Sequence, residues 1–140
     1  MRQTNAAAAE ILRAHGVTAC TDVTGFGVAG HLLEMLRASA VGAVIRVDDM
    51  PVLPGALELA GQGVESTLAA ANRAALPPGA RGPRRDLLAD PQTSGGLLAG
   101  VPARRVEACL AALHEAGMQA AVIGVVDTDG VHEGGPIRIV

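Results

Sequence analysis

A glycine-containing turn between two regular segments constrains the fold of this chain more than any other part of its sequence. The turn, Gly25-Phe26-Gly27, separates a strand predicted over residues 17–23 from a helix predicted over residues 28–39, where apolar residues recur at helical spacing. A β-branched run over residues 41–47 predicts a second strand. The chain therefore contains a β-α-β unit, which implies a sheet with at least one helix packed against it.

The rest of the sequence alternates between helical and extended patterns. Residues 6–14 predict a short helix that begins after Thr4 or Asn5 and ends at Gly16. The other predicted elements are short helices over residues 54–60 and 67–75, a strand over residues 97–101, a helix over residues 102–116, and strands over residues 120–126 and 137–140. Asp129-Gly130 predicts a hairpin turn between the last two strands, and we expect Asp127 to serve the same turn.

This order of elements is typical of a ferredoxin-like, split β-α-β arrangement rather than an extended doubly wound sheet. We therefore predict an α+β fold in which a mixed, mostly antiparallel sheet is packed by helices. The length of the chain favours a single domain over residues 1–140. Residues 61–86, rich in proline and glycine, are the least regular segment, and we expect Arg81, Arg84 and Arg85 to lie there in a solvated loop.

Charge and aromatic content exclude several classes of function. The 140 residues carry 11 basic and 14 acidic side chains, and every basic residue is arginine. Without lysine, the chain can form no Schiff base and holds no P-loop lysine. Phe26 is the one aromatic residue, so the chain has no stacking platform for single-stranded nucleic acid, and no basic run would bind a phosphate backbone. We expect no nucleic-acid partner.

The cysteines and the apolar runs bear on the compartment. Cys20 and Cys109 lack metal-ligand spacing and are too few for a disulfide scaffold. No apolar run approaches the length of a membrane span, and the first residues do not resemble a signal peptide. We therefore expect a cytoplasmic protein without membrane contact, in which Cys20 is a small buried residue of its strand.

Residues 25–30 match the pattern G-x-G-x-x-G, and Asp48 follows roughly 20 residues later, as in a dinucleotide-binding (Rossmann) fingerprint. Two features disfavour that interpretation. Asp22 stands just before the first glycine and would repel a pyrophosphate unless a cation intervened. The remaining strands also come with one crossover helix, which is too few for a full dinucleotide-binding fold.

The same turn suits a metal-bridged phosphate. Asp22, at the end of a strand, offers the hard oxygen ligand that Mg²⁺ prefers. Thr24 can cap the following helix, whose N-terminal amides favour anions, while Gly25 and Gly27 let the backbone approach a ligand closely. The alternative is purely structural: Asp22 and Thr24 cap the helix, and the glycines only turn the chain. The spacing alone leaves both open.

A second polar segment precedes the predicted strand at residues 97–101. Asp90-Pro91 initiates a turn, after which Thr93, Ser94 and Gly95 offer hydroxyls and accessible amides to an anion. The alternative is a glycine-rich entry to the strand. We favour a loop that faces an active site.

Two long segments carry a family resemblance. Residues 19–27 (ACTDVTGFG), followed by Gly30-His31 and Glu34-Met35, and residues 88–98 (LADPQTSGGLL) resemble the signatures of selenophosphate synthetase (selenide, water dikinase). Residues 51–56 and 123–126 fall in the expected places between and after them. The chain looks like the C-terminal domain of this family, whose two-domain members are similar to the aminoimidazole ribonucleotide synthetase superfamily.

The resemblance implies a reaction and a partial site. The family makes selenophosphate from selenide and ATP with Mg²⁺, releasing AMP and orthophosphate, and the position matching Asp22 is a metal ligand at the ATP phosphates. The other metal carboxylates, the Cys or selenocysteine nucleophile and its Lys belong to an N-terminal domain that we expect to be absent here. The resemblance also implies a homodimer at full length. We expect no catalytic residue in this chain and no activity of the chain alone; a stand-alone binding or regulatory module is the alternative.

The histidines are weaker candidates for a role in binding. His31 follows the glycine turn, where support of the site is open, but a histidine on the helix surface is the commoner case. His15 lies at a helix end, and His114 and His132 have no partner at metal-ligand spacing.

Overall fold

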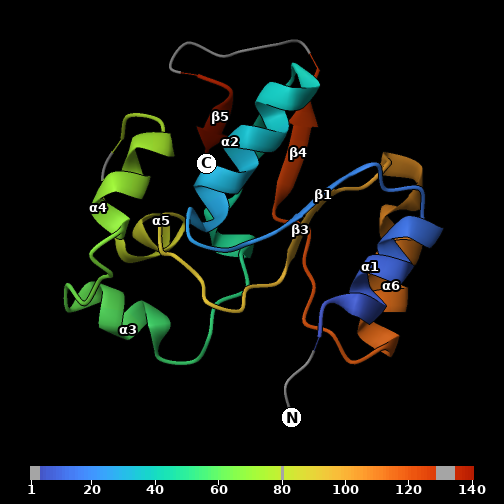
Figure 1. The fold of residues 1–140 in the computed structure, drawn as a ribbon, viewed down its shortest axis with the longest axis horizontal. Helices are drawn as coiled ribbons and strands as arrows, with labels where there is room; N and C mark the ends of the chain where they lie inside the picture. Colours follow the sequence, from blue (N-terminus) through green and yellow to red (C-terminus); the bar gives the residue numbers. More distant parts are fainter. Residues whose placement is uncertain (1–3, 80, 129–134) are drawn as a thin grey trace.

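Helices and strands alternate along the chain in the computed structural model, which describes residues 4–79, 81–128 and 135–140 (Figure 1). The helices are α1 (Ala6–Ala14), α2 (Gly27–Ser39), α3 (Ala56–Gly61), α4 (Ala69–Asn72), α5 (Pro83–Leu87) and α6 (Val106–Glu115). The strands are β1 (Ala19–Asp22), β2 (Gly42–Ile45), β3 (Leu97–Gly100), β4 (Gly124–Asp127) and β5 (Ile137–Ile139). Short 3-10 helices cover Val47–Asp49, Arg73–Ala75 and Ala103–Arg105. The predicted α+β class is therefore confirmed.

β1 and β3 form a two-stranded antiparallel sheet that joins the two halves of the chain. Ala19 pairs with Gly100 at one end of the ladder, and Asp22 pairs with Leu97 at the other. The pairing brings the segment after β1 and the segment before β3 to the same end of this sheet. These are the two segments that the sequence singled out.

β2 is the central strand of a second sheet, with β4 antiparallel on one side and β5 parallel on the other. The predicted hairpin between the last two strands is wrong, because β4 and β5 both pair with β2 rather than with each other. Asp127 is the last residue of β4, and Asp129-Gly130 lies outside the described residues. Gly124 permits the close pairing, since a Cβ there would lie 2.3 Å from the carbonyl oxygen of Val44.

The division into two sheets also contradicts the dinucleotide-binding alternative. A Rossmann unit would place the strands on either side of α2 next to each other and parallel. Here β1 belongs to the first sheet and β2 to the second. Asp48, the candidate ribose ligand, instead lies 3.4 Å from the guanidinium of Arg84.

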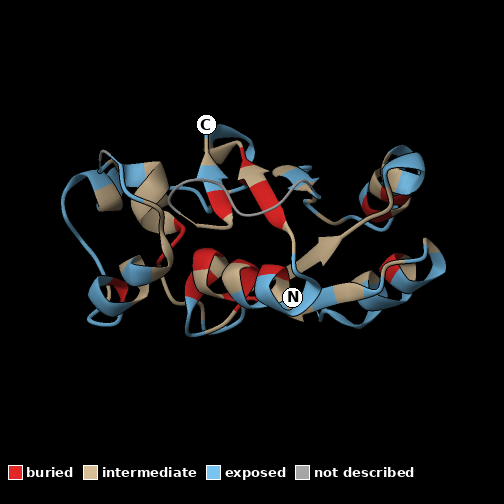
Figure 2. Cartoon of the chain, turned by 90° about the horizontal axis from the view of Figure 1, so that it is seen from above, coloured by how far each residue is buried: buried red, intermediate tan, exposed pale blue. Residues whose placement is uncertain are grey.

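Aliphatic residues form the core in three clusters, and Figure 2 shows buried residues concentrated on α2 and the strands beside it. The first cluster packs α2 on the second sheet through Leu32, Leu36, Ala43, Ile45 and Ile137. The second packs α1 and α6 on the first sheet through Leu12, Cys109 and Leu113. The third, of Ala29, Met50 and Leu88, joins α2 to the segment before β3. Phe26 takes no part in these clusters, because 56% of its surface is exposed.

Residues 61–86 are more ordered than the sequence predicts. The predicted helix at residues 67–75 is present as α4 and the 3-10 turn after it, whereas α5 was not predicted. Pro83 occupies the start of α5, where a missing amide hydrogen costs nothing. Among the described helices, none is long and apolar enough to cross a membrane.

Two arginines of this segment bind backbone rather than solvent. Arg84 Nη1 donates to the carbonyl oxygen of Met50 at 3.1 Å, and the Arg85 guanidinium donates to the carbonyl oxygen of Pro77. Both side chains are partly buried. The expectation of a solvated loop is therefore wrong for Arg84 and Arg85; these side chains tie the segment together.

The packing of α2 on the second sheet yields a stability prediction. Leu36 is 3% exposed, so Leu36→Ala should lower the free energy of unfolding by about 2–5 kcal/mol through lost burial and a residual cavity. Leu53 is 74% exposed, so Leu53→Ala is the matched control and should change it by less than about 0.5 kcal/mol. Urea denaturation followed by circular dichroism measures both, and equal losses would contradict the assignment of this core.

Candidate functional site

The two segments singled out by the sequence are joined directly by their backbones. The amide of Val23 donates to the carbonyl oxygen of Gly96 at 2.9 Å, and the amide of Gln92 donates to that of Thr24 at 3.0 Å. A Cβ on Gly95 would lie 2.1 Å from the carbonyl oxygen of Val23, which is closer than any side chain permits. Gly95 is therefore required for this contact, and the two loops form one structural unit.

The start of α2 is closed by the same unit. The Gly27 amide donates to the carbonyl oxygen of Thr24 at 3.0 Å, and the Ala29 amide donates to that of Leu88 at 2.9 Å. Gly27 has a φ of +66°, and a Cβ there would lie 2.8 Å from Leu88 O. The predicted anion site at the helix N-terminus is wrong for these two amides, because carbonyl groups of the chain already occupy them. Within the described residues, the amides of Gly25 and Phe26 make no hydrogen bond.

Asn72, at the end of α4, ties this unit to residues 61–86. Its Nδ2 donates to the carbonyl oxygen of Gly25 at 2.8 Å and to that of Ala89 at 3.1 Å, so one amide group binds both segments. Sequence reasoning missed Asn72, because it stands in an alanine-rich run with no motif around it. Asn5 was expected as a helix cap, but its side chain donates to the carbonyl oxygen of Gly95 at 3.1 Å instead.

Asp22 ends β1 with an exposed carboxylate. It forms no ion pair and accepts no side-chain hydrogen bond within the described residues, and it does not cap α2. No group of three potential metal-binding side chains occurs in the described part of the chain, so Asp22 could supply one ligand of a metal but not a complete site.

Cys20 lies two residues before Asp22 on the same face of β1. It is exposed, so the expectation of a buried residue is wrong. Partial burial of the thiol and, secondly, the charge of Asp22 raise the pKa of Cys20 above its ordinary value. Cys20 is therefore poorly ionised near neutral pH, which disfavours it as a nucleophile.

Thr24 binds a histidine rather than capping a helix. Its Oγ1 lies 3.0 Å from Nε2 of His31, whereas the N-cap of α2 is Phe26, without a side-chain hydrogen bond. His31 is 8% exposed, so the prediction of a surface histidine is wrong. On its other side, His31 Nδ1 lies 3.4 Å from Oε2 of Glu34. The structural alternative, in which Asp22 and Thr24 both cap the helix, is therefore contradicted.

The second segment presents two hydroxyls beside this turn. Thr93 and Ser94 are exposed, and their side chains make no hydrogen bond within the described residues. Backbone hydrogen bonds join Gln92 to Thr24 on one side of them and Gly96 to Val23 on the other. These bonds hold residues 93–95 alongside residues 23–25. The amides of Gly25 and Phe26 and these two hydroxyls are thus donors without a partner within the described residues, on two adjoining segments.

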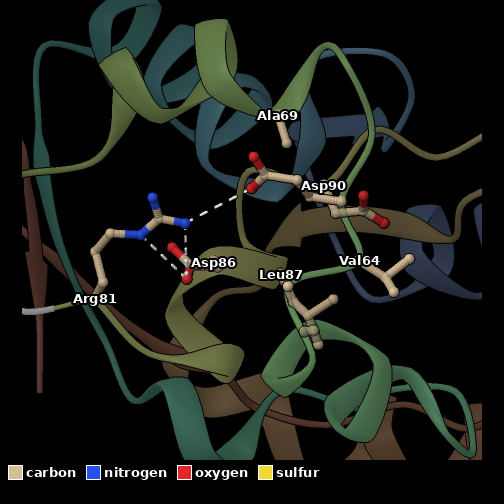
Figure 3. A pocket seen from close by; sticks show the side chains of 9 residues that line it. Val64, Ala69, Arg81, Asp86, Leu87 and Asp90 are labelled. Atoms are coloured by element: carbon tan, nitrogen blue, oxygen red, sulfur yellow. Dashed lines mark hydrogen bonds and ion pairs between the residues drawn. The ribbon is translucent and has the colours of Figure 1, made fainter.

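A separate pocket lies beside α5 and is filled with paired charges (Figure 3). It is lined by Ala60, Gly63, Val64, Glu65, Ala69, Arg81, Asp86, Leu87 and Asp90. Arg81 lies 3.3 Å from Asp86 and 3.6 Å from Glu65.

An outer arginine completes this network. Arg73 Nη1 donates to Glu65 Oε2 at 2.6 Å, and this bond lowers the pKa of Glu65 and raises that of Arg73. Because the pocket's Arg81 and the neighbouring Arg73 are already paired with carboxylates, this pocket is a poor site for a phosphate.

The comparisons with known proteins agree on one family. A family model described as "AIR synthase related protein, C-terminal domain" matches residues 1–135. Proteins named selenide, water dikinase are similar over most of the chain. That of Nitratidesulfovibrio vulgaris is 40% identical over 128 residues, which are 87% of this chain and 37% of that protein. That of Pelobacter propionicus is 44% identical over 133 residues, which are 90% of this chain and 38% of that protein. The chain therefore spans little more than a third of the length of these curated relatives.

The contact at Gly95 can be tested against its neighbour. Gly95→Ala should lower the free energy of unfolding by about 2 kcal/mol or more, because the backbone of Val23 must move away. Gly96→Ala is the matched control: no atom lies within 4 Å of the added Cβ, so the change should stay below about 0.5 kcal/mol. Urea denaturation measures the difference, and amide chemical shifts of residues 23–25 should move in the first variant alone.

The proximity of Asp22 to Cys20 predicts a change in thiol reactivity. Asp22→Asn removes the negative charge, so the pKa of Cys20 should fall and alkylation by iodoacetamide near pH 8 should accelerate. Partial burial remains as the larger cause, so the pKa should stay above the ordinary value. Cys109 is buried and should not react in the folded chain. Glu107→Gln on α6 is the control, and a pH–rate profile unchanged by Asp22→Asn would contradict this geometry.

Proposed function

Because the chain belongs to the family described as "AIR synthase related protein, C-terminal domain", we propose that it is the C-terminal domain of a selenide, water dikinase. In this role it supplies one metal ligand and one wall of the site that holds the phosphates of ATP. The complete enzyme makes selenophosphate from selenide and ATP, with AMP and orthophosphate as the other products. The remainder of the site belongs to a further domain of the full-length protein.

The observation that carries this proposal is the exposed carboxylate of Asp22 beside donors that have no partner within the described residues. An unpaired carboxylate at a strand end is the hard oxygen ligand that Mg²⁺ takes, together with phosphate oxygens and water. Asp22 fits such an ion as a single ligand, so the other ligands come from the nucleotide and from the rest of the protein. Bound Mg²⁺ neutralises charge on the phosphates as they react.

The donors beside Asp22 suit the phosphates themselves. The amides of Gly25 and Phe26 and the hydroxyls of Thr93 and Ser94 make no bond within the described residues, so a phosphate oxygen can accept from them. Gly27 and Gly95 serve this wall indirectly: both let the two segments approach closely enough for their donors to face one ligand. Thr24 lies between Asp22 and these amides, in contact with His31.

The chain supplies neither the lysine nor the reactive thiol that the reaction requires. It has no lysine, and the thiol of Cys20 is held in its protonated form by burial and by Asp22. The residues of this domain therefore bind and orient the nucleotide, and they neither attack it nor transfer a proton to it. The chain alone should form no AMP from ATP and selenide.

The test is Asp22→Asn in the full-length protein, with AMP formation from ATP and selenide as the measurement. We expect a loss on the order of 100-fold or more, since even outer partners of metal ligands contribute 10–100-fold. Asp49→Asn is the matched control, because Asp49 is paired with Arg46 and should leave activity unchanged. A fully active Asp22→Asn enzyme, or AMP formation by the 140-residue chain alone, would overturn the proposal.

A further inference from the structure

Three side chains in series lead from the surface of α2 to the candidate site. Glu34 Oε2 lies 3.4 Å from His31 Nδ1, and His31 Nε2 lies 3.0 Å from Thr24 Oγ1. The side chain of Glu34 is 63% exposed, whereas His31 is buried with its ring 5.6 Å from that of Phe26. The series therefore begins at a solvated carboxylate and ends at a hydroxyl two residues after Asp22.

Helix geometry makes this series possible. His31 and Glu34 are three residues apart, which places them on the same face of α2. Side chains on a helix lean toward its N-terminus, so the ring of His31 reaches back to the turn that precedes the helix. The ring of Phe26 packs against it at a tilt of 58°. The imidazole is held between Glu34 and Thr24.

The contacts favour one tautomer of the neutral ring. A carboxylate only accepts hydrogen bonds, so the Glu34 carboxylate, 3.4 Å from Nδ1, favours a proton on that nitrogen. Nε2 is then an acceptor, and the hydroxyl of Thr24 donates its hydrogen to it. As a result, Thr24 has no hydrogen left to donate outward, and its oxygen presents only lone pairs.

We propose that His31, held by Glu34, is a positioning residue that makes the Thr24 hydroxyl an acceptor and so fits it to a metal cation rather than to a phosphate oxygen. The inference rests on the proposed function for the identity of the cation, Mg²⁺. Asp22 and Thr24 flank the buried Val23, whose amide extends the pairing of β1 with β3 by its bond to Gly96, and alternation along a paired strand puts them on one face. On this face a carboxylate then lies beside a hydroxyl whose hydrogen is already donated to His31. Neither group offers a hydrogen to a ligand, so the pair favours a cation.

The alternative is that the Thr24–His31 bond only steadies the turn before α2. Both roles predict some loss of stability when the bond is removed, so stability alone does not separate them. They differ in the state of the ring and in the response of the enzyme to Mg²⁺. Both can be measured, the first on the chain itself and the second on the full-length protein.

The state of the ring is read from long-range ¹H–¹⁵N spectra of the imidazoles at about pH 8, where an ordinary histidine is neutral. We expect His31 to show a protonated Nδ1 and an unprotonated Nε2. His114 provides the opposite reference, since its Nε2 lies 2.8 Å from the carbonyl oxygen of Ala120 and must donate. His15 provides the matching one, because its Nδ1 faces the carbonyl oxygen of Ile11 at 2.8 Å. A protonated Nε2 on His31 would overturn the inference.

The response to Mg²⁺ is read from Thr24→Val and Thr24→Ser in the full-length protein. Thr24→Val should raise the half-saturating Mg²⁺ concentration about 10-fold or more, while kcat at saturating Mg²⁺ falls less. Thr24→Ser, which keeps the hydroxyl, should leave the half-saturating concentration near its original value. His31→Gln should act in the same direction, with His114→Gln as the control. An unchanged Mg²⁺ dependence in Thr24→Val would make the bond structural and overturn the inference. Activity retained in Asp22→Asn would instead count against the proposed function, so the two failures are distinguishable.

Discussion

The close backbone contact at Gly95 is the constraint on which the candidate site depends. β1 and β3 bring their ends together, and the hydrogen bonds at Val23 and Thr24 extend that pairing into the loops beyond the strands. Since Gly95 sits where a Cβ would meet the carbonyl oxygen of Val23, any other residue would separate the loops. The polar groups of both segments lie alongside one another only because this position lacks a side chain.

The same contact decides what the helix terminus can do. The amides at the start of an α-helix have no partner within the helix, and they commonly bind an anion. Here the segment before β3 lies across α2 so closely that Leu88 supplies a carbonyl oxygen to Ala29, and Gly27 is needed to allow it. The free amides therefore lie in the turn before the helix, where those of Gly25 and Phe26 make no hydrogen bond within the described residues.

Local patterns in the sequence predicted most of the elements. The helix at residues 6–14 and the strands around residues 19–22, 42–45 and 97–100 follow from periodicity, β-branching and glycine boundaries, and all are present. The pairing of β4 and β5 was mispredicted, because a turn signal says nothing about a central strand contributed from elsewhere. α5 was missed because its five residues, which begin with the proline of a Gly-Pro pair, carry no helical period.

Residues whose role depends on distant partners could not be predicted from the sequence. Asn72 has no local signal: its amide matters only because Gly25 and Ala89 meet beside it. His31 fits a helix surface equally well until its contacts with Phe26 and Thr24 are known. Asp22 and the glycines could be proposed from the sequence because they combine a strand end with a sharp turn, and that combination is visible in a single stretch of chain.

Under the proposed function, the isolated carboxylate of Asp22 needs further ligands from outside this chain. One carboxylate gains little by holding a divalent cation at an exposed position, because water competes for the ion. Binding becomes favourable when a nucleotide and further carboxylates share the ion, and when the site is closed to water. The donors of Gly25, Phe26, Thr93 and Ser94 that make no hydrogen bond within the described residues have the same property: solvent satisfies them, and under the proposed function a phosphate replaces it. The absence of lysine is consistent with such a wall, which orients a charged ligand without reacting with it.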